Sequence, residues 1–330
     1  MRSLVLIAST IFISLSSYGQ AKIDDNVSSL KSVETLRLPA LDNVSLKKYY
    51  KLNGKQSTAL RFAEPRDVSI IPQKHGTWEQ TQDNVMVWRQ RIVSPNAHSI
   101  NLAFTKFYLP PSASLFVYNV DKTESIGPLT KSDNDEHMQY WTPLITGQEV
   151  VIELQISPEE LDDYKLELSR VNHDFTNIQK SFSGSCNIDV ECGSEDGYPL
   201  VDEYRDIIRS VGAYTVGGID ACSGTLINNA RNDCTPYFLT AEHCGIRTTN
   251  AASVVIYWNY QNSTCRQPNG SQSGGIGNGL RNQFNSGSQL RASLNNSDFA
   301  LIELDDPIDP EMNLYFSGWN RQVELTDTSI

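Results

Sequence analysis

All six cysteines of this 330-residue chain lie between residues 186 and 265, and the first 185 residues contain none. The six are Cys186, Cys192, Cys222, Cys234, Cys244 and Cys265. Disulfides restrict a fold by closing loops, so this distribution separates a half that folds without bridges from a half that can use them. At about 150 residues to a domain, the length independently predicts two domains.

The N-terminus indicates the cellular compartment. Arg2 precedes an apolar run at residues 4–15, which ends in a polar stretch with the small residues Ser17 and Gly19. This pattern is typical of a secretory signal peptide cleaved after Gly19. The run is too short to anchor the protein in a membrane, which takes about 20 apolar residues. We therefore expect residues 1–19 to be a signal peptide and the protein to be secreted without a membrane anchor.

Export makes disulfides the expected state of the cysteines. Zinc binding is the alternative, but the chain has no Cys-x-x-Cys pair and its cysteine spacings match no common zinc pattern. The formal net charge of −12 argues against binding to nucleic-acid phosphates or to anionic lipid. We expect no metal site, no cofactor and no nucleic-acid partner.

The cysteine-free half reads as short strands separated by turns rich in Pro, Gly and Asn. The candidate strands are residues 85–93, 102–109, 115–120, 150–156 and 164–168. Strands at this spacing predict an antiparallel β-sandwich. Nothing in this half suggests catalysis, and its residues leave open whether it is a binding module, a folding aid or an inhibitory propeptide.

The most informative segment is residues 237–244, in which an apolar run ends directly before Glu242, His243 and Cys244. A histidine at the end of a strand, held by a neighbouring bridge, suits a general base because proton transfer needs an oriented imidazole. Cys222 lies 22 residues upstream in another apolar segment. A bridge between Cys222 and Cys244 would join the two strands, and a loop of this size contributes about 3 kcal/mol.

A second candidate is Asp298, at the head of the alternating segment 299–304. We expect this carboxylate to be partly buried and to accept a hydrogen bond from the Nδ1–H of His243, which would set the imidazole tautomer and stabilise the imidazolium. Taken alone, Asp298 reads more simply as a turn residue before a strand.

Together, residues 239–244 (LTAEHC) and 297–304 (SDFALIEL) resemble the histidine and aspartate motifs of trypsin-like serine proteases. Further segments are similar to one branch of that family, the secreted lysyl endopeptidases: residues 184–190, 205–214, 255–265 and 317–320. Residues 75–78 and 141–143 are similar to the propeptide of such enzymes. The resemblance covers residues 181–323 nearly continuously.

The resemblance implies an all-β protein, with a β-sandwich propeptide at residues 20–180 and a trypsin-like protease domain at residues 181–330. That domain would comprise the first barrel, and the start of the second, of a two-β-barrel serine protease. His243 matches the general base and Asp298 the carboxylate that orients it. The family's nucleophilic serine is expected in a Gly-x-Ser-Gly turn after Asp298, where this chain has none.

We therefore expect the chain to be a truncated precursor that is inactive by itself and whose serine lies beyond residue 330. Ser273, in the glycine-rich segment 270–275, precedes Asp298, which is the wrong order for the family. A flexible loop is the simpler reading of that segment.

The resemblance also implies cysteine pairings. It suggests the bridges Cys222–Cys244 and Cys192–Cys265, and it ties Cys186 to a C-terminal barrel that is absent here. Cys234 has no clear counterpart, so it could pair with another absent cysteine or with Cys186.

The sequence predicts a processing site where the two halves meet. Lys180 directly precedes Ser181, the start of the segment that resembles a mature protease. A lysine-specific protease could cut there itself, although a chance lysine in a linker is the alternative. We expect protein or peptide substrates cut after Lys and a propeptide packed on the protease domain. The competing hypotheses are a catalytically inactive homologue and a secreted β-sandwich binding or adhesion protein.

Overall fold

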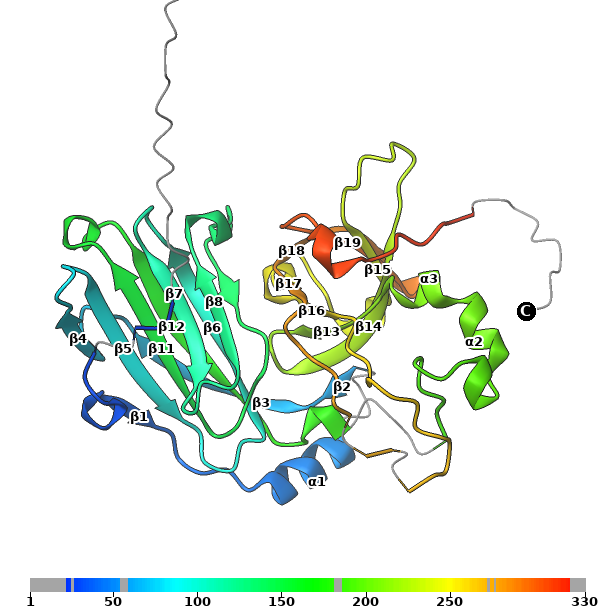
Figure 1. Ribbon diagram of the computed structural model, residues 1–330, viewed down its shortest axis with the longest axis horizontal. Helices are drawn as coiled ribbons and strands as arrows, with labels where there is room; N and C mark the ends of the chain where they lie inside the picture. The colour runs from blue at the N-terminus through cyan, green and yellow to red at the C-terminus, as the bar shows by residue number, and fades with distance from the viewer. Residues whose placement is uncertain are drawn as a thin grey trace, which may run out of the picture.

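The computed structural model describes residues 22–24, 27–53, 59–180, 186–271, 274–275 and 277–320. The predicted signal peptide at residues 1–19, Ser181 and Ser273 lie outside the described residues. Within them the chain forms two β-rich lobes, one from each half of the sequence (Figure 1). The prediction of an all-β fold is confirmed.

The N-terminal half is a sandwich of two sheets. One sheet has the order β1-β5-β11-β7-β8 with β4 beside β5, and the other has the order β10-β6-β12-β3 with β9 beside β6. The strands of the first sheet are β1 (Thr35–Arg37), β4 (Thr77–Gln80), β5 (Met86–Val93), β7 (Ser114–Asn119), β8 (Ser125–Leu129) and β11 (Glu149–Ile156). Those of the second are β3 (Ala63–Ile70), β6 (Ser99–Tyr108), β9 (Tyr140–Trp141), β10 (Ile145–Thr146) and β12 (Lys165–Asp174). Inward-facing side chains of both sheets, such as Trp88, Leu154 and Phe104, form one continuous apolar core.

Each of the five predicted strands corresponds to one observed strand, and β12 runs six residues past its predicted end to Asp174. The prediction missed β3, whose sequence AEPRDVSI contains charges and Pro65 in place of a clean alternation. Proline is tolerated there because β3 lies at the edge of its sheet. It also missed helix α1 (Asn43–Asn53), which follows the acidic N-cap Asp42.

The C-terminal half is a curled sheet with the strand order β17-β16-β13-β14-β15-β19-β18. Its strands are β13 (Val211–Val216), β14 (Asp220–Ile227), β15 (Tyr237–Thr240), β16 (Val255–Trp258), β17 (Phe284–Ser286), β18 (Ser288–Leu294) and β19 (Phe299–Leu304). β17 and β18 lie at opposite ends of this order, yet only Gly287 separates them in the chain. The two ends of the sheet therefore meet, and the sheet closes into a barrel around a core that includes Tyr214, Phe238 and Trp258. Two short helices, α2 (Pro199–Glu203) and α3 (Arg205–Ile208), precede it.

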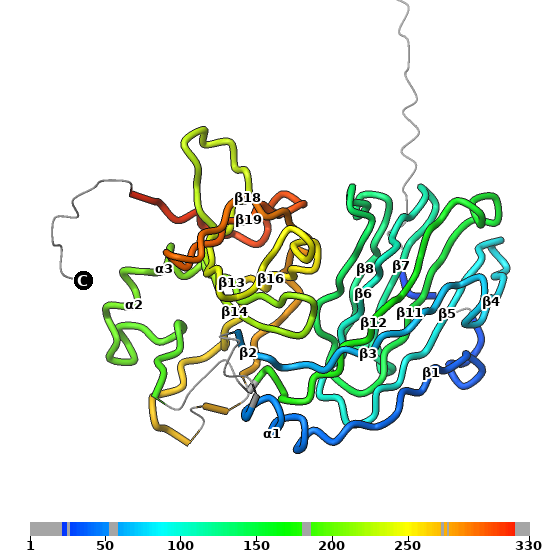
Figure 2. Tube along the Cα trace, turned by 180° about the vertical axis from the view of Figure 1, so that it is seen from behind, coloured from blue at the N-terminus to red at the C-terminus, as the bar shows by residue number. Residues whose placement is uncertain are grey.

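The two lobes meet along a seam that has its own apolar core. The sandwich half contributes Phe62, Trp141 and Leu144, and the barrel contributes Ala221 and Tyr257, among others. In addition, β2 (Leu60–Arg61) of the N-terminal half pairs with the start of β14 and so joins the sheet of the barrel (Figures 1 and 2). The segment that carries β2 and β3 thus links the two lobes through backbone hydrogen bonds.

Two buried amides bring the lobes into close contact at the turn between β13 and β14. The Nδ2 of Asn101 donates to the carbonyl of Gly218 at 2.9 Å, and the Nδ2 of Asn172 donates to that of Gly217 at 3.1 Å. A Cβ at residue 218 would lie 2.0 Å from the Oδ1 of Asn101, and the φ of Gly218 is +65°. Glycine is therefore required at 218 both by the backbone conformation and by the approach of the other lobe.

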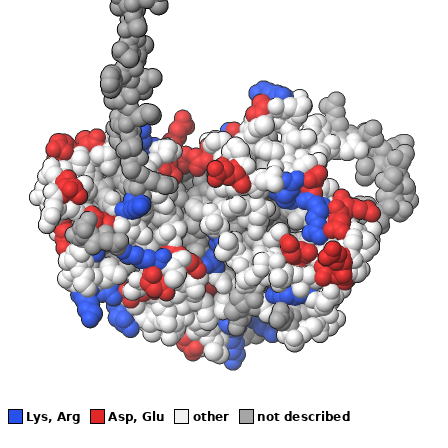
Figure 3. All heavy atoms as spheres, viewed as in Figure 1, with Lys and Arg blue, Asp and Glu red and all other residues white. Residues whose placement is uncertain are grey.

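Charged side chains of both signs are interspersed over the face seen in Figure 3. No helix among the described residues is long and apolar enough to cross a lipid bilayer.

Candidate active site

His243 lies on the single 3₁₀ turn Glu242–Cys244, which follows β15 directly. The burial of the strand alternates, with Phe238 and Thr240 facing the barrel core. Gly245 ends the turn in the left-handed conformation, with φ +80°, and its N–H donates to the carbonyl of Glu242. This tight turn after a buried strand gives the histidine backbone a defined position at the rim of the barrel.

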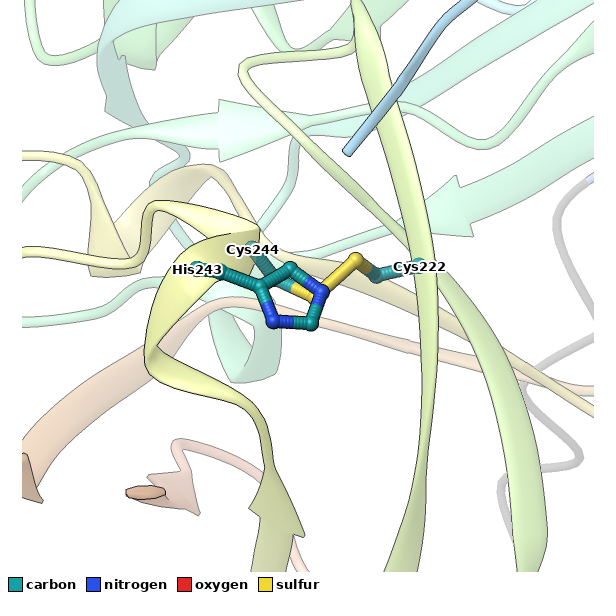
Figure 4. Close-up of side chains that lie close together, drawn as sticks. All are labelled: Cys222, His243 and Cys244. Carbon is teal, nitrogen blue, oxygen red and sulfur yellow. A yellow bond between two sulfur atoms is a disulfide. The ribbon is translucent and has the colours of Figure 1, made fainter. Parts of the chain in front are cut away.

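A disulfide between Cys222 and Cys244 holds this turn on the neighbouring strand. Cys222 lies on β14, which pairs with β15, and the imidazole of His243 lies beside the bridge (Figure 4). Cys244 is buried in the barrel core. The residue next to the histidine is therefore fixed both covalently and by packing.

Asp298 is brought to His243 by the pairing of β15 with β19. Thr240 is opposite Ala300 in this ladder, so the residues two positions beyond each of them, Glu242 and Asp298, face one another. The N–H of Glu242 donates to the carbonyl of Asp298 at 3.2 Å. Asp298 itself adopts φ 50° and ψ 43°, a left-handed conformation that Asp and Asn reach more readily than most residues.

The carboxylate of Asp298 contacts His243 twice. Its Oδ1 accepts from the backbone N–H of His243 at 2.9 Å, and its Oδ2 lies 2.6 Å from Nδ1 of the ring. These two hydrogen bonds, the backbone one first, hold the pKa of Asp298 below its usual range. An ionised Asp298 favours a proton on Nδ1, which leaves Nε2 as the basic nitrogen.

The expectation that Asp298 is partly buried is wrong. The side chains of Asp298 and His243 keep 50% and 42% of their full exposure. The residue sits in the connection between the 3₁₀ turn Asn295–Ser297 and β19, where its side chain is open to solvent. Its partners are therefore supplied by the turn of His243 and not by a buried pocket.

Sequence reasoning missed a hydrogen-bond network behind the histidine turn. The hydroxyl of Thr240 donates to the carbonyl of Ser223 at 2.9 Å and lies 2.8 Å from the hydroxyl of the buried Tyr214. The network joins β13, β14 and β15 directly below His243. Threonine at the end of an otherwise apolar strand is the signal in the sequence that points to it.

A cavity of about 340 Å³ adjoins His243 and is lined by both halves of the chain. The sandwich half contributes Gln139, Trp141 and Arg170, and Ala59 lies next to β2. The barrel contributes His243 with residues such as Asp220 and Asn250. In this conformation the N-terminal half thus forms part of the wall around the candidate base.

Three groups of side chains among the described residues bring possible metal ligands together. In two of them the sulfur ligands belong to the disulfides Cys222–Cys244 and Cys192–Cys265, and bridged sulfurs are not available as thiolates. The third is Asp135, His137 and Asp305, in which the Nδ1 of His137 accepts from the N–H of Gln139 and the Nε2 lies 3.0 Å from Asp305. Both nitrogens of that ring are engaged by protein groups.

The remaining candidates are placed as follows. The bridge Cys192–Cys265 is present, so both disulfides have the pairing implied by the resemblance, and Cys186 and Cys234 are free and exposed. The structure therefore does not contain the Cys186–Cys234 bridge that was one alternative. Lys180 ends the 3₁₀ turn Ile178–Lys180, whose first residue is buried in the seam.

The barrel carries a histidine at the end of one strand, hydrogen-bonded to an aspartate at the head of the neighbouring strand in the sheet. This is the arrangement found in the chymotrypsin-like class of proteases. Comparison with known proteins narrows this class. A family model described as "Lysyl endopeptidase N-terminal domain" matches residues 37–175, and one described as "Lysyl endopeptidase, C-terminal domain" matches residues 181–330. The chain belongs to the lysyl endopeptidase family.

A curated relative agrees with this assignment. A lysyl endopeptidase of Pseudomonas aeruginosa is 28% identical over 138 residues, which cover 38% of this chain and 29% of that relative. The chain therefore aligns with less than a third of the length of this relative.

Proposed function

We propose that the chain is the precursor of a secreted serine endopeptidase that cuts peptide bonds on the carboxyl side of Lys. Residues 1–19 would be its signal peptide, residues 20–180 its propeptide, and residues 181–330 would belong to the protease domain. The observation that carries the proposal is the double contact between Asp298 and His243, at 2.9 Å to the backbone N–H and 2.6 Å to Nδ1.

The geometry suits general-base catalysis. Asp298 holds the proton on Nδ1 and orients the ring, so that Nε2 can take the proton of an attacking hydroxyl. As the imidazolium forms, the ionised Asp298 stabilises its positive charge. The serine that this mechanism requires is proposed to come from the second barrel of the fold, in a Gly-x-Ser-Gly turn. Since no such turn follows Asp298 in the 330 residues, these residues by themselves are expected to be inactive.

The proposed preference for Lys rests on the family, and the proposed role of residues 20–180 as a propeptide rests on the seam between the lobes. Membership of the lysyl endopeptidase family supports the proposed preference for Lys. The role of residues 20–180 as a propeptide is supported by their share in the wall of the cavity at His243 and by the amide contacts of Asn101 and Asn172. Cleavage after Lys180 would release this half from a protease that begins at Ser181.

The proposal is tested by expressing the protein from its complete coding sequence. The parent protein is compared with the two single variants Asp298→Asn and His243→Ala. Turnover of lysyl, arginyl and alanyl ester substrates is measured for each. Asp298→Asn is expected to lower kcat on the lysyl ester by about 10⁴, because the imidazole then takes the wrong tautomer. His243→Ala is expected to lose at least as much.

The matched control is Asp233→Asn, an exposed carboxylate in the loop before β15 that accepts from Thr235. It should keep full activity. If both active-site variants retained turnover, the assignment of His243 and Asp298 would be wrong. If the parent protein turned over no ester, a catalytically inactive binding homologue would become the better description.

A further inference from the structure

A histidine and four carboxylates meet at the seam between the two lobes. The loop after the 3₁₀ turn Lys131–Asp133 of the sandwich half carries Asp135 and His137. From the barrel, Asp305 follows β19 and reaches across the seam. Its Oδ2 lies 3.0 Å from the Nε2 of His137, and the side chain of Asp305 keeps only 5% of its exposure.

The other charged members surround this contact. The Oδ2 of Asp135 lies 3.7 Å from the same Nε2, and Asp133, two residues earlier, is the last residue of the 3₁₀ turn. Asp306 follows Asp305 on the barrel side and lies close enough to Asp133 for their charges to interact. Carboxylates thus face one another from both lobes, and His137 is the basic member between them.

The pKa values of Asp133, Asp135, Asp306 and His137 are all raised. Burial, followed by the charge of Asp305, raises the pKa of Asp135 to about 6. Burial also raises the pKa of Asp133 and, together with the charges of Asp133 and Asp305, that of Asp306. For His137, burial lowers the pKa, but the hydrogen bond and the charge of Asp305 outweigh it and the net shift is upward.

The charge of Asp305 contributes to the raised pKa of Asp135 and of His137, and the charge of Asp133 contributes to that of Asp306, so these groups bind their protons more tightly when the lobes are docked than when they are apart. Each such group therefore stabilises the docked state at low pH, and its contribution disappears as the pH rises through the raised pKa. The N–H of Gln139 points at Nδ1 of His137 from 3.1 Å and favours the neutral ring, whereas the carboxylates favour the charged one. In either case a rise in pH weakens the docked state, because the pKa values of the three carboxyl groups are raised as well.

We propose that this cluster of Asp133, Asp135, His137, Asp305 and Asp306 is a proton-dependent latch between the lobes. It holds the seam closed at mildly acidic pH and loosens it as the pH rises, when His137 and the facing carboxyl groups lose their protons and the carboxylates repel one another. The latch concerns the contact between the lobes and does not require that the chain be a protease.

The seam offers a specific probe for this proposal. The backbone N–H of Leu144, in the sandwich half, donates to the hydroxyl of Tyr257, in the barrel, at 3.0 Å. Hydrogen exchange of this amide therefore reports opening of the seam. The amide of Ile152, in the centre of the first sandwich sheet, serves as the internal reference. Exchange is measured on the full chain at pH 5.5 and at pH 8 and corrected for intrinsic chemistry.

Protection of Leu144 is expected to fall roughly tenfold or more between these pH values, while that of Ile152 stays constant. In Asp135→Asn, which removes one carboxylate without changing its size, the fall should shrink and protection at pH 8 should rise. Asp306→Asn gives an independent second variant with the same expected direction. Asp162→Asn, an exposed turn residue of the sandwich half, is the control and should behave as the parent does.

Three results would overturn the latch. One is protection of Leu144 that does not depend on pH in the parent protein. Another is an equal loss at Ile152, which would mean that the whole sandwich opens. The third is an unchanged pH response in both Asp135→Asn and Asp306→Asn.

Discussion

The two lobes of this protein stabilise their β-sheets by different means. The sandwich closes one continuous core between two sheets and contains no cysteine. The barrel has a smaller core, of which Cys244 is itself a part, and long connections such as the one between β16 and β17. Both of its disulfides anchor such segments, one at the histidine turn and one where Arg266 also pairs with Asp189. The disulfides of the barrel thus reinforce connections outside its strands, which the sandwich lobe does without.

This comparison has a consequence for function. The candidate base lies on a covalently fixed turn of the barrel, whereas the sandwich contributes only to the wall beside it. Changes to the barrel should therefore alter both stability and the site, and changes to the sandwich should act through the seam.

Removing the disulfides is expected to have the largest effect on stability. The chain-entropy model gives about 4 kcal/mol for Cys192–Cys265, with its separation of 73 residues, and about 3 kcal/mol for Cys222–Cys244. In double Cys→Ala variants, denaturant unfolding should show a destabilised barrel and an unchanged sandwich, monitored by hydrogen exchange at the amides of Trp258 and Ile152 respectively. Cys234→Ser, which removes an exposed free thiol, should shift neither transition by more than about 0.5 kcal/mol. An equal shift of the sandwich transition would show that the lobes do not differ in this way.

An intermediate effect is expected at the seam from Gly218→Ala. The new Cβ would meet the side chains of Asn101 and Asn172 and would also strain a backbone with φ +65°. Gly197→Ala separates the two causes, because Gly197 has φ +90° with nothing within 4 Å of a Cβ. We expect about 1 kcal/mol of destabilisation for Gly197→Ala and about 2–3 kcal/mol for Gly218→Ala. Equal costs in chemical denaturation, or unchanged exchange at Leu144, would contradict a tight contact at this turn.

The smallest effect is expected from an ion pair across the seam. Arg281 of the barrel donates to both carboxylate oxygens of Glu124, in the turn between β7 and β8, at 3.0 and 2.9 Å. Because Glu124 is partly exposed, Glu124→Gln should weaken the seam by less than about 1 kcal/mol, and the difference should shrink at high salt. The control is Glu167→Gln, whose partner Lys106 lies in the same lobe. Seam exchange at Leu144 should respond to the first change alone, and a response to Glu167→Gln would argue against a seam-specific effect.

Much of the architecture could be predicted because its causes are local. Alternation along β5, β6, β7 and β11 reveals which side chains of each strand face the sandwich core, without knowledge of the neighbouring strands. The strand that ends in His243, and the alternating strand that follows Asp298, are visible for the same reason. β3 could not be predicted, because its sequence contains charges and Pro65 and does not alternate. Such a strand can still form at the edge of a sheet, where it pairs on one side only.

The sequence by itself determined the division into two lobes, the segment that carries His243, the carboxylate that can orient it and the cysteines available to fix the turn. These are properties of residue type and spacing along a few turns of chain. The tertiary structure alone decided that Asp298 meets His243 from an exposed left-handed turn, that Gly287 closes the barrel and that His137 faces Asp305. Each of these brings together residues from strands or lobes far apart in the sequence, and a contact of that kind depends on sheet pairing and on the docking of whole surfaces, which no local pattern encodes.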